Sequence, residues 1–152
     1  MKEATKIRIY EIKDKAAVLG LFDLNTPAFF AVEEKQDLIR YLDSELEYYC
    51  VLELGGSLAG CGGINFSKDG AHARISWDLI DPRLHGKGLG SLLLKHRLEI
   101  LRTNKSVQTI TVRTSQLAYL FYQKNGFVLV ETQRDYWAKG FDLYRMDYPM
   151  PN

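Results

Sequence analysis

A glycine-rich turn over residues 84–90, Leu-His-Gly-Lys-Gly-Leu-Gly, is the part of this chain best suited to chemistry. It lies between an apolar, partly β-branched run at residues 75–80 and a run with leucines at helical spacing at residues 91–102. Asp81-Pro82 ends the first run, because proline cannot donate to a sheet ladder. Such a turn before a helix exposes free backbone N–H groups at the positive end of the helix dipole. The pattern therefore predicts a phosphate-binding site.

Two common phosphate sites fit this turn poorly. A Walker A loop requires Ser or Thr directly after its Gly-Lys pair, but Lys87 is followed by Gly88. A dinucleotide-binding fingerprint requires G-x-G-x-x-G and an acidic residue roughly 20 positions later. The glycines here are spaced G-x-G-x-G, and residues 107–112 hold no acid. The turn is therefore a phosphate site of another type or, alternatively, a surface turn before an ordinary helix.

A second motif follows at residues 115–127, Ser-Gln-Leu-Ala-Tyr-Leu-Phe-Tyr-Gln-Lys-Asn-Gly-Phe. It closely resembles the segment N-x-x-A-x-x-F-Y-x-K-x-G-F of the GNAT superfamily, the acetyl-CoA-dependent N-acetyltransferases. The turn resembles the R/Q-x-x-G-x-G/A loop of the same superfamily, with His85 in the place of Gln or Arg. Arg83 also fits that pattern, but the His85 register puts Gly90 against the apolar helix, as in the family. With both motifs in family order and spacing, the chain is identified as a member.

The resemblance implies that acetyl-CoA is the co-substrate, that its pyrophosphate binds the backbone N–H groups of the turn, and that no metal is needed. The backbone of Leu79 and Ile80 should hold the acetyl carbonyl and the pantetheine arm. Ser115 stands where the family often has Asn, so we expect a water-mediated contact there. Lys87 either adds charge or is a solvated surface lysine. The implied acetyl-CoA-binding residues are Leu79, Ile80, His85, Gly86, Lys87, Gly88, Leu89, Gly90, Ser91, Ser115 and Tyr119.

The resemblance also implies that Tyr122, the tyrosine of the F-Y pair, is the general acid that protonates the departing sulfur. A phenol has an unperturbed pKa near ~10, close enough to the ~8.5 of a thiol for this transfer. The alternative is a tyrosine that only packs on its helix. Asp78 is the candidate general base, because strand alternation would place it with Ser76 on the face away from the core, bordering the acceptor. Its alternatives are an ion pair with Arg74 or another neighbour, and proton loss through ordered water.

The acceptor is expected to be a primary amine of a small molecule, with a protein amine as the alternative. A different class of function is a non-catalytic acyl-CoA-binding or sensing module on the same fold. Phe29 and Phe30 either pack between two helices or form a wall of the acceptor pocket. Residues 133–144 are predicted to form a long loop that lines a specificity pocket. Packing of the final hairpin and a homodimer surface are the alternatives for this segment.

These groups must be positioned by an α+β fold of the GNAT type, in one domain over residues 1–152. We expect a mixed, mostly antiparallel sheet of about seven strands with helices on both faces. The expected strands cover residues 6–10, 48–54, 57–66, 73–80, 106–113, 127–132 and 143–148. The expected helices cover residues 14–22, capped by Asp14, then 33–47, 91–102 and 117–124. Strands 73–80 and 106–113 should be parallel, joined by helix 91–102 as a βαβ crossover.

The composition argues against several functions. A net charge of +1 gives no electrostatic basis for binding nucleic acid or an anionic membrane. Cys50 and Cys61 show neither metal-ligand nor disulfide spacing and lie in apolar strands, which predicts buried free thiols. Residues 1–6 are polar and no apolar signal region follows, and no run approaches the length of a membrane span. A cytoplasmic location is therefore expected.

Overall fold

Seven strands form one sheet in the computed structural model, which describes residues 4–150. The strand order is β1-β2-β3-β4-β5-β7-β6, and neighbouring strands are antiparallel except β4 and β5. The strands are β1 (Thr5–Ile9), β2 (Tyr48–Leu54), β3 (Ser57–Phe66), β4 (His72–Ile80), β5 (Thr109–Thr114), β6 (Val128–Ala138) and β7 (Phe141–Tyr148). The α-helices are α1 (Lys15–Leu24), α2 (Lys35–Ser44), α3 (Leu89–Arg102) and α4 (Tyr119–Lys124).

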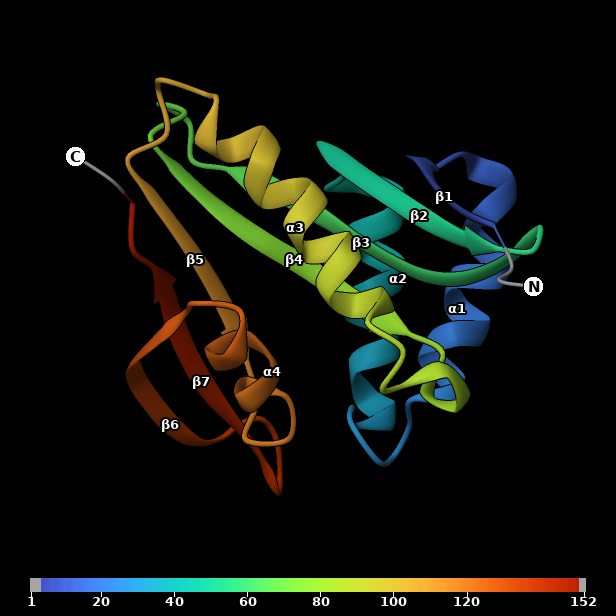
Figure 1. Cartoon of the computed structure of the whole chain (residues 1–152). Coiled ribbons are helices and arrows are strands. Elements are labelled where there is room, and N and C mark those ends of the chain that lie inside the picture. Colours follow the sequence, from blue (N-terminus) through green and yellow to red (C-terminus); the bar gives the residue numbers. More distant parts are fainter. Residues whose placement is uncertain (1–3, 151–152) are drawn as a thin grey trace.

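The helices cover both faces of the sheet, as the sequence predicted. α3 crosses one face as the connection between the parallel strands β4 and β5, and α1 and α2 lie behind the other face (Figure 1). Apolar residues of α1 and α2 pack on Val51 and Leu79 of the sheet, whereas those of α3 pack on Ile75 and Ile110. Within residues 4–150, no helix is both long and apolar enough to cross a membrane.

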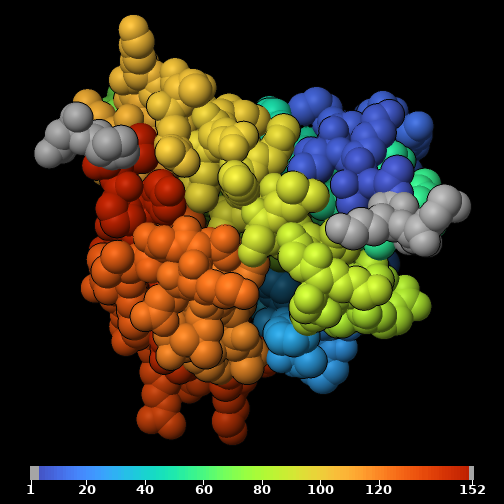
Figure 2. Space-filling view, viewed as in Figure 1, coloured from blue at the N-terminus to red at the C-terminus, as the bar shows by residue number. Residues whose placement is uncertain are grey.

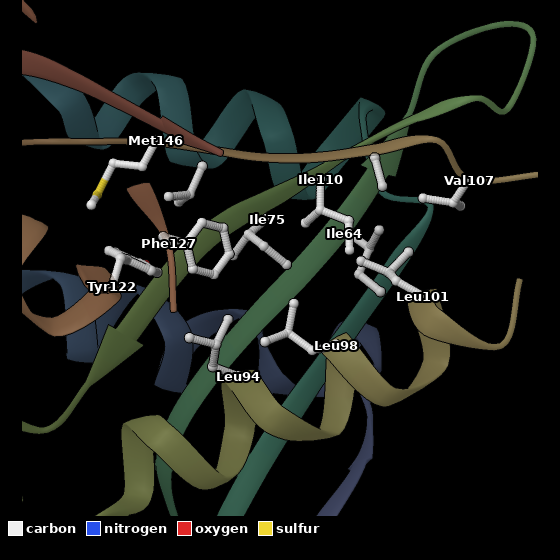
Figure 3. Packing of buried hydrophobic residues seen from close by; sticks show 12 residues of the cluster. Ile64, Ile75, Leu94, Leu98, Leu101, Val107, Ile110, Tyr122, Phe127 and Met146 are labelled. Atoms are coloured by element: carbon white, nitrogen blue, oxygen red, sulfur yellow. The ribbon is translucent and has the colours of Figure 1, made fainter. Parts of the chain in front are cut away.

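The apolar cluster beneath α3 reaches the region of α4 (Figure 3). Leu94 and Leu98 of α3 lie on one side of this cluster, and Phe127 lies near the end that holds Tyr122 and Met146. The ring of Tyr122 packs edge-on against Phe127, with a centroid distance of 5.6 Å. The aromatic ring of Tyr122 is therefore fixed by the core, which determines where its hydroxyl group can lie.

β4 and β5 separate part-way along their length. Their paired register ends at Ile75 and Val112, although β4 continues to Ile80. Figure 1 shows the two ribbons diverging toward α4. Residues 76–80 of β4 therefore keep β3 as a neighbour but leave β5. The sheet is split at this point, and the split positions the site described below.

Local interactions move some helix ends away from the predicted positions. Asp14 does not cap α1 with its side chain; its carboxylate accepts the N–H of Glu11 at 2.8 Å and pairs with Arg8 at 2.8 Å. The helix predicted over 33–47 is a 3₁₀ turn at Val32–Glu34 followed by α2, which ends at Ser44.

The prediction of a long loop over residues 133–144 is wrong. β6 continues to Ala138 and turns at residues 139–140 into β7. Two irregularities in the β6–β7 register, one after Leu129 and one after Gln133, interrupt the alternation from which the strand was predicted. Asp135 lies in the second irregularity with a φ of 52°. The segment is therefore a bulged hairpin arm.

Cys50 and Cys61 are free thiols with no exposed surface, as predicted. Burial raises the pKa of Cys50 to about 11 and that of Cys61 to about 12. We expect no reaction of the native protein with a thiol-specific reagent at pH 8, and reaction of both cysteines after unfolding in urea. Absorbance from the released chromophore would measure both states. Rapid labelling of the native protein would contradict this burial.

Candidate active site

A cavity of about 680 Å³ opens where β4 and β5 separate. Its lining comes from the segment after α1, from β4 and β5, from the turn before α3, from α4 and from the β6–β7 hairpin. In Figure 2 the surface is hollowed between the yellow-green turn before α3 and the orange region of α4. Ligand sites for small molecules and cofactors typically enclose ~300–1,000 Å³. The split sheet therefore provides an opening of ligand size.

The glycine-rich turn lies at the rim of this cavity. Gly86 and Gly88 have φ values of 82° and 78°, which glycine adopts without a steric penalty. Gly88 is the N-cap of α3, and the N–H groups of the first helical turn have no acceptor within the helix. Gly86, Gly88, Gly90 and Ser91 all line the cavity. Free N–H groups at the positive end of a helix favour an anionic ligand such as a pyrophosphate.

Asp78 does not share a face with Ser76, so this part of the sequence prediction is wrong. Trp77 has a φ of 48°, and the β3–β4 register shifts between Cys61 and Gly63, which makes a bulge in β4. Ser76 faces α2, where its hydroxyl shares the Asn65 side chain with Tyr41. The bulge turns Asp78 to the opposite face, toward α3 and α4.

Asp78, Arg97 and Tyr122 meet beside the cavity and come from β4, α3 and α4. The hydroxyl of Tyr122 donates to Oδ2 of Asp78 at 2.7 Å. Nη1 of Arg97 lies 2.5 Å from Oδ1 of the same carboxylate, as an ion pair rather than a directed hydrogen bond. One carboxylate therefore contacts both a phenol and a guanidinium group.

Arg97 is a fully buried cation on the apolar side of α3. Its Nη1 donates to the carbonyl of Gly63 at 3.1 Å and its Nε donates to the carbonyl of Leu93 at 3.2 Å. Its Nη2 is buried without a hydrogen-bond partner among the described residues. A Cβ at Gly62 would collide with both the Asp78 carboxylate and the guanidinium group. Glycine at this position therefore leaves the room that the ion pair occupies.

Electrostatics keep Tyr122 protonated and Arg97 charged. Burial raises the pKa of Tyr122 well above its usual value, and the adjacent charge of Asp78 raises it further. Burial disfavours the charged form of Arg97, but attraction to Asp78 outweighs this and raises the pKa of the guanidinium group. The site therefore contains a buried ion pair and a phenol that retains its proton around neutral pH.

Aromatic side chains border the cavity on two sides. Phe30 stacks on Trp77 with a centroid distance of 6.0 Å, and both side chains also pack on the core beneath α1. Phe29 also lines the cavity, and its ring packs edge-on against His85 with a centroid distance of 5.2 Å. On the other side, Trp137 of the β6–β7 hairpin lines the cavity, and the Arg113 guanidinium lies 5.5 Å from its ring centroid. An acceptor molecule can thus be enclosed between two aromatic walls.

The Acetyltransferase (GNAT) family pattern matches residues 18–127 of this chain. The chain belongs to the GNAT family. The N-alpha-acetyltransferase RimI of Mycobacterium tuberculosis is 33% identical to it over 113 residues, which make up 70% of this chain and 69% of that protein. The motifs that carried the resemblance in the sequence therefore identified the family correctly.

Solved structures show the same fold. The ribosomal-protein-S18-alanine N-acetyltransferase of Escherichia coli superposes with a TM-score of 0.78 at 20% identity, over 98% of this chain and 96% of that chain. The N-acetylglutamate synthase of Neisseria gonorrhoeae, complexed with coenzyme A and N-acetyl-glutamate, gives a TM-score of 0.74 at 15% identity. That match covers all of this chain and 36% of the other. At these identities the likeness concerns the fold alone.

As a GNAT N-acetyltransferase, this protein uses acetyl-CoA, and its own geometry fits that co-substrate. The turn before α3 offers N–H groups to a pyrophosphate, and the split between β4 and β5 leaves room for an extended arm leading toward Tyr122. In the described part of the chain, no group of three or more His, Cys, Asp or Glu side chains is arranged to hold a metal ion.

The structure brings together most of the site residues predicted from the sequence and from the GNAT resemblance. The residues of that set that line the cavity are Asp78, Ile80, His85, Gly86, Gly88, Leu89, Gly90, Ser91, Ser115 and Tyr122. Lys87 is exposed at the rim. The Leu79 side chain is buried beneath α1 and α2. Tyr119 does not line the cavity; its ring packs at a tilt against Tyr144, with a centroid distance of 4.7 Å.

Sequence reasoning missed Arg97 and Gly62. Arg97 lies four residues after Leu93 and four before Leu101, so it interrupts the apolar stripe of the GNAT helix α3. An arginine among the apolar positions of this helix could have indicated a buried ion pair, because a buried charge is normally paired with an opposite one. Gly62 gave no separate signal, because it lies in a strand with several other glycines.

Proposed function

We propose that this GNAT enzyme transfers an acetyl group from acetyl-CoA to the primary amine of a small molecule, in a ternary complex, with Tyr122 as the general acid. The observation that carries the proposal is the position of Tyr122, whose side chain lines the cavity in the split between β4 and β5. The cavity continues from there to the glycine-rich rim. A pyrophosphate at the rim directs the thioester end of the co-substrate toward this phenol.

The residues divide the chemistry between them. The neutral amine nitrogen attacks the acetyl carbon, the carbon–sulfur bond breaks, and the sulfur takes a proton from Tyr122. Asp78 is the group that takes the proton from the amine, because its carboxylate lines the cavity. Neither Cys50 nor Cys61 is suited to a covalent route, since both are buried and burial raises their pKa values.

A small acceptor is favoured by the aromatic enclosure. Phe30 and Trp77 form one wall and Trp137 forms the facing one, so the acceptor can be surrounded by apolar surface on two sides. The acidic residues Glu34 and Glu45 also line the cavity and favour a cationic amine. The second candidate acceptor is the α-amine of a peptide, which the N-alpha-acetyltransferase relative favours.

A two-panel assay distinguishes these acceptors. The release of CoA is followed at saturating acetyl-CoA with a panel of small amines, among them polyamines, amino sugars and amino acids, and with a panel of short peptides. We expect at least one small amine to be turned over with a kcat/KM ~10-fold above that of any peptide. Faster turnover of peptides would select the second candidate. Binding of acetyl-CoA without turnover in either panel would instead indicate a sensing module.

A further inference from the structure

A buried charge network links the proposed base to the proposed acid. Asp78 accepts a hydrogen bond from the Tyr122 hydroxyl at 2.7 Å and forms an ion pair with the Arg97 guanidinium group at 2.5 Å. We infer that Arg97 is a positioning residue for acetyl transfer, the fixed counter-ion of a proton relay in which Asp78 and Tyr122 act as one unit. The inference rests on the proposed function and adds to it a residue outside both sequence motifs. It also explains why the acid and the base are in direct contact.

The hydrogen bond has a direction that matters for catalysis. Tyr122 donates its proton to Asp78, so this proton is not free for another acceptor while Asp78 is ionised. Burial and the adjacent negative charge both raise the pKa of Tyr122 and make it a poor acid in this state. Protonation of Asp78 removes the charge and reverses the hydrogen bond. The same proton on Tyr122 then becomes available to the sulfur.

The relay balances as follows. The amine nitrogen bonds to the acetyl carbon, the carbon–sulfur bond breaks, and the electron pair of that bond stays on sulfur. The amine gives one proton to Asp78, the neutral carboxyl group then donates a hydrogen bond to the Tyr122 oxygen, and the Tyr122 proton moves to sulfur. Finally the proton on Asp78 passes to the Tyr122 oxygen along the existing 2.7 Å contact. The net result is one amine proton on the CoA thiol, with both side chains restored.

Arg97 suits the role of counter-ion because its charge does not change during these steps. The relay carries one negative charge on the Asp78 carboxylate at rest and on the Tyr122 oxygen after this oxygen has protonated sulfur, and it is neutral while Asp78 and Tyr122 both hold a proton. Arg97 attracts the charge in both positions. Its contacts with the carbonyls of Gly63 and Leu93 fix the guanidinium group in place.

Stability alone does not account for this ion pair. Taking two charges out of water is costly, and well-packed apolar replacements of buried ion pairs are often neutral or stabilising. Arg97 is 0% exposed on a helix face that otherwise carries leucines. Gly62 is also required, because any side chain there would displace the pair. The position of the pair beside Tyr122 favours a functional explanation.

Other titratable groups near Asp78 stay neutral between pH 6 and 9. They are Tyr49 and Cys50 of β2 and Cys61 of β3, which interact electrostatically with Asp78. Burial raises the pKa of Cys50 to about 11, that of Cys61 to about 12, and that of Tyr49 well above its usual value. A pH-dependent difference between Arg97 variants therefore reports on Asp78 and Tyr122.

The test compares Asp78→Asn, Arg97→Gln and the double variant with the wild type. For each protein kcat is measured from pH 6 to 9 at saturating substrates. Arg97→Gln should lower kcat by ~10²-fold at pH 6.5, and the deficit should shrink as the pH rises, because high pH restores the unpaired carboxylate. The loss of kcat in Asp78→Asn, relative to the wild type, should not vary with pH. The double variant should match Asp78→Asn within about twofold, since Arg97 acts through Asp78.

Two further variants separate the relay from folding effects. Arg97→Lys keeps the positive charge and should retain ~10-fold more activity than Arg97→Gln. Arg102→Gln removes an exposed arginine from the same helix and should keep the wild-type kcat. If Arg97→Gln does not fold, Arg97→Lys replaces it in the test. The several-fold loss of kcat caused by Arg97→Lys should then vanish when Asp78 is already replaced by Asn. Circular dichroism and acetyl-CoA affinity establish that each protein is folded.

The outcomes are distinct. Two results would overturn the role of Arg97 while leaving the proposed function intact. The first is a wild-type kcat in folded Arg97→Gln. The second is an equal loss of kcat on removing Arg97 from the wild type and from Asp78→Asn. An absence of turnover by the wild type with every amine would overturn the proposed function, and the relay with it. The relay would be established if the double variant had the kcat of Asp78→Asn and if, among the variants, only Arg97→Gln showed a loss of kcat that depends on pH.

Discussion

Replacing Tyr122 with phenylalanine is expected to lower kcat by ~10²- to 10⁴-fold, the range that general acid catalysis contributes. The ring contact with Phe127 and the core packing remain, because only the hydroxyl group is removed. The hydrogen bond to Asp78 is lost, yet this carboxylate keeps its ion pair with Arg97. The affinity for acetyl-CoA should therefore change by less than about twofold. Steady-state kinetics and a binding isotherm measure the two effects separately.

Tyr148→Phe is the matched control for this substitution. Tyr148 also packs on Phe127, with a centroid distance of 5.2 Å, but it lies at the end of β7, away from the cavity. We expect its kcat to equal that of the wild type. An unchanged kcat in Tyr122→Phe, at matched pH and substrate, would show that another group protonates the sulfur.

Phe127→Ala is expected to lower the free energy of unfolding by ~3–5 kcal/mol, because it removes a large side chain from the core beneath α3. Phe127 is 2% exposed and lies beside Tyr122 in the cluster (Figure 3), and it also contacts Tyr148. For a chain of this size, the midpoint of thermal unfolding should fall by ~6–20 °C. Urea denaturation at 25 °C measures the free energy directly.

Val128→Ala provides the comparison for this core substitution. Val128 is the next residue in the chain, but its side chain is 53% exposed, so its truncation should change stability by less than ~0.5 kcal/mol. Equal losses in the two variants would contradict the position of Phe127 in the core. Activity of folded Phe127→Ala should also fall, since the ring of Tyr122 loses its edge contact.

The sequence predicted the features that depend on local chemistry. The turn at residues 84–90, the parallel pair β4 and β5 and the crossover helix α3 all follow from glycine spacing and apolar periodicity. The family followed from the F-Y motif that contains Tyr122. The turn and the helix depend on local sequence, and the parallel pairing follows from the crossover connection through α3, so all three can be predicted from the order of residues.

The errors arose where the backbone departs from regular geometry. The face of Asp78 was derived from strict alternation along β4, which the bulge at Trp77 breaks. The end of β6 was missed for the same reason, because Asp135 lies in a register shift. The pairing of Asp78 with Arg97 joins residues far apart in sequence through this bulge, so periodicity could not reveal it.

Thermal unfolding with and without acetyl-CoA tests the central claim most directly. A ligand that binds only the folded state, at ~100 times its Kd, adds ~2.7 kcal/mol of stability, which is a shift of ~5–10 °C for this chain. We expect this shift with acetyl-CoA but not with ATP or NAD. It should be lost in Gly86→Asp, which places a negative charge in the turn, and retained in Gly56→Asp. Both glycines have positive φ, 82° and 85°, and open space around a Cβ. No shift with acetyl-CoA, or equal shifts in both variants, would contradict binding at the turn before α3.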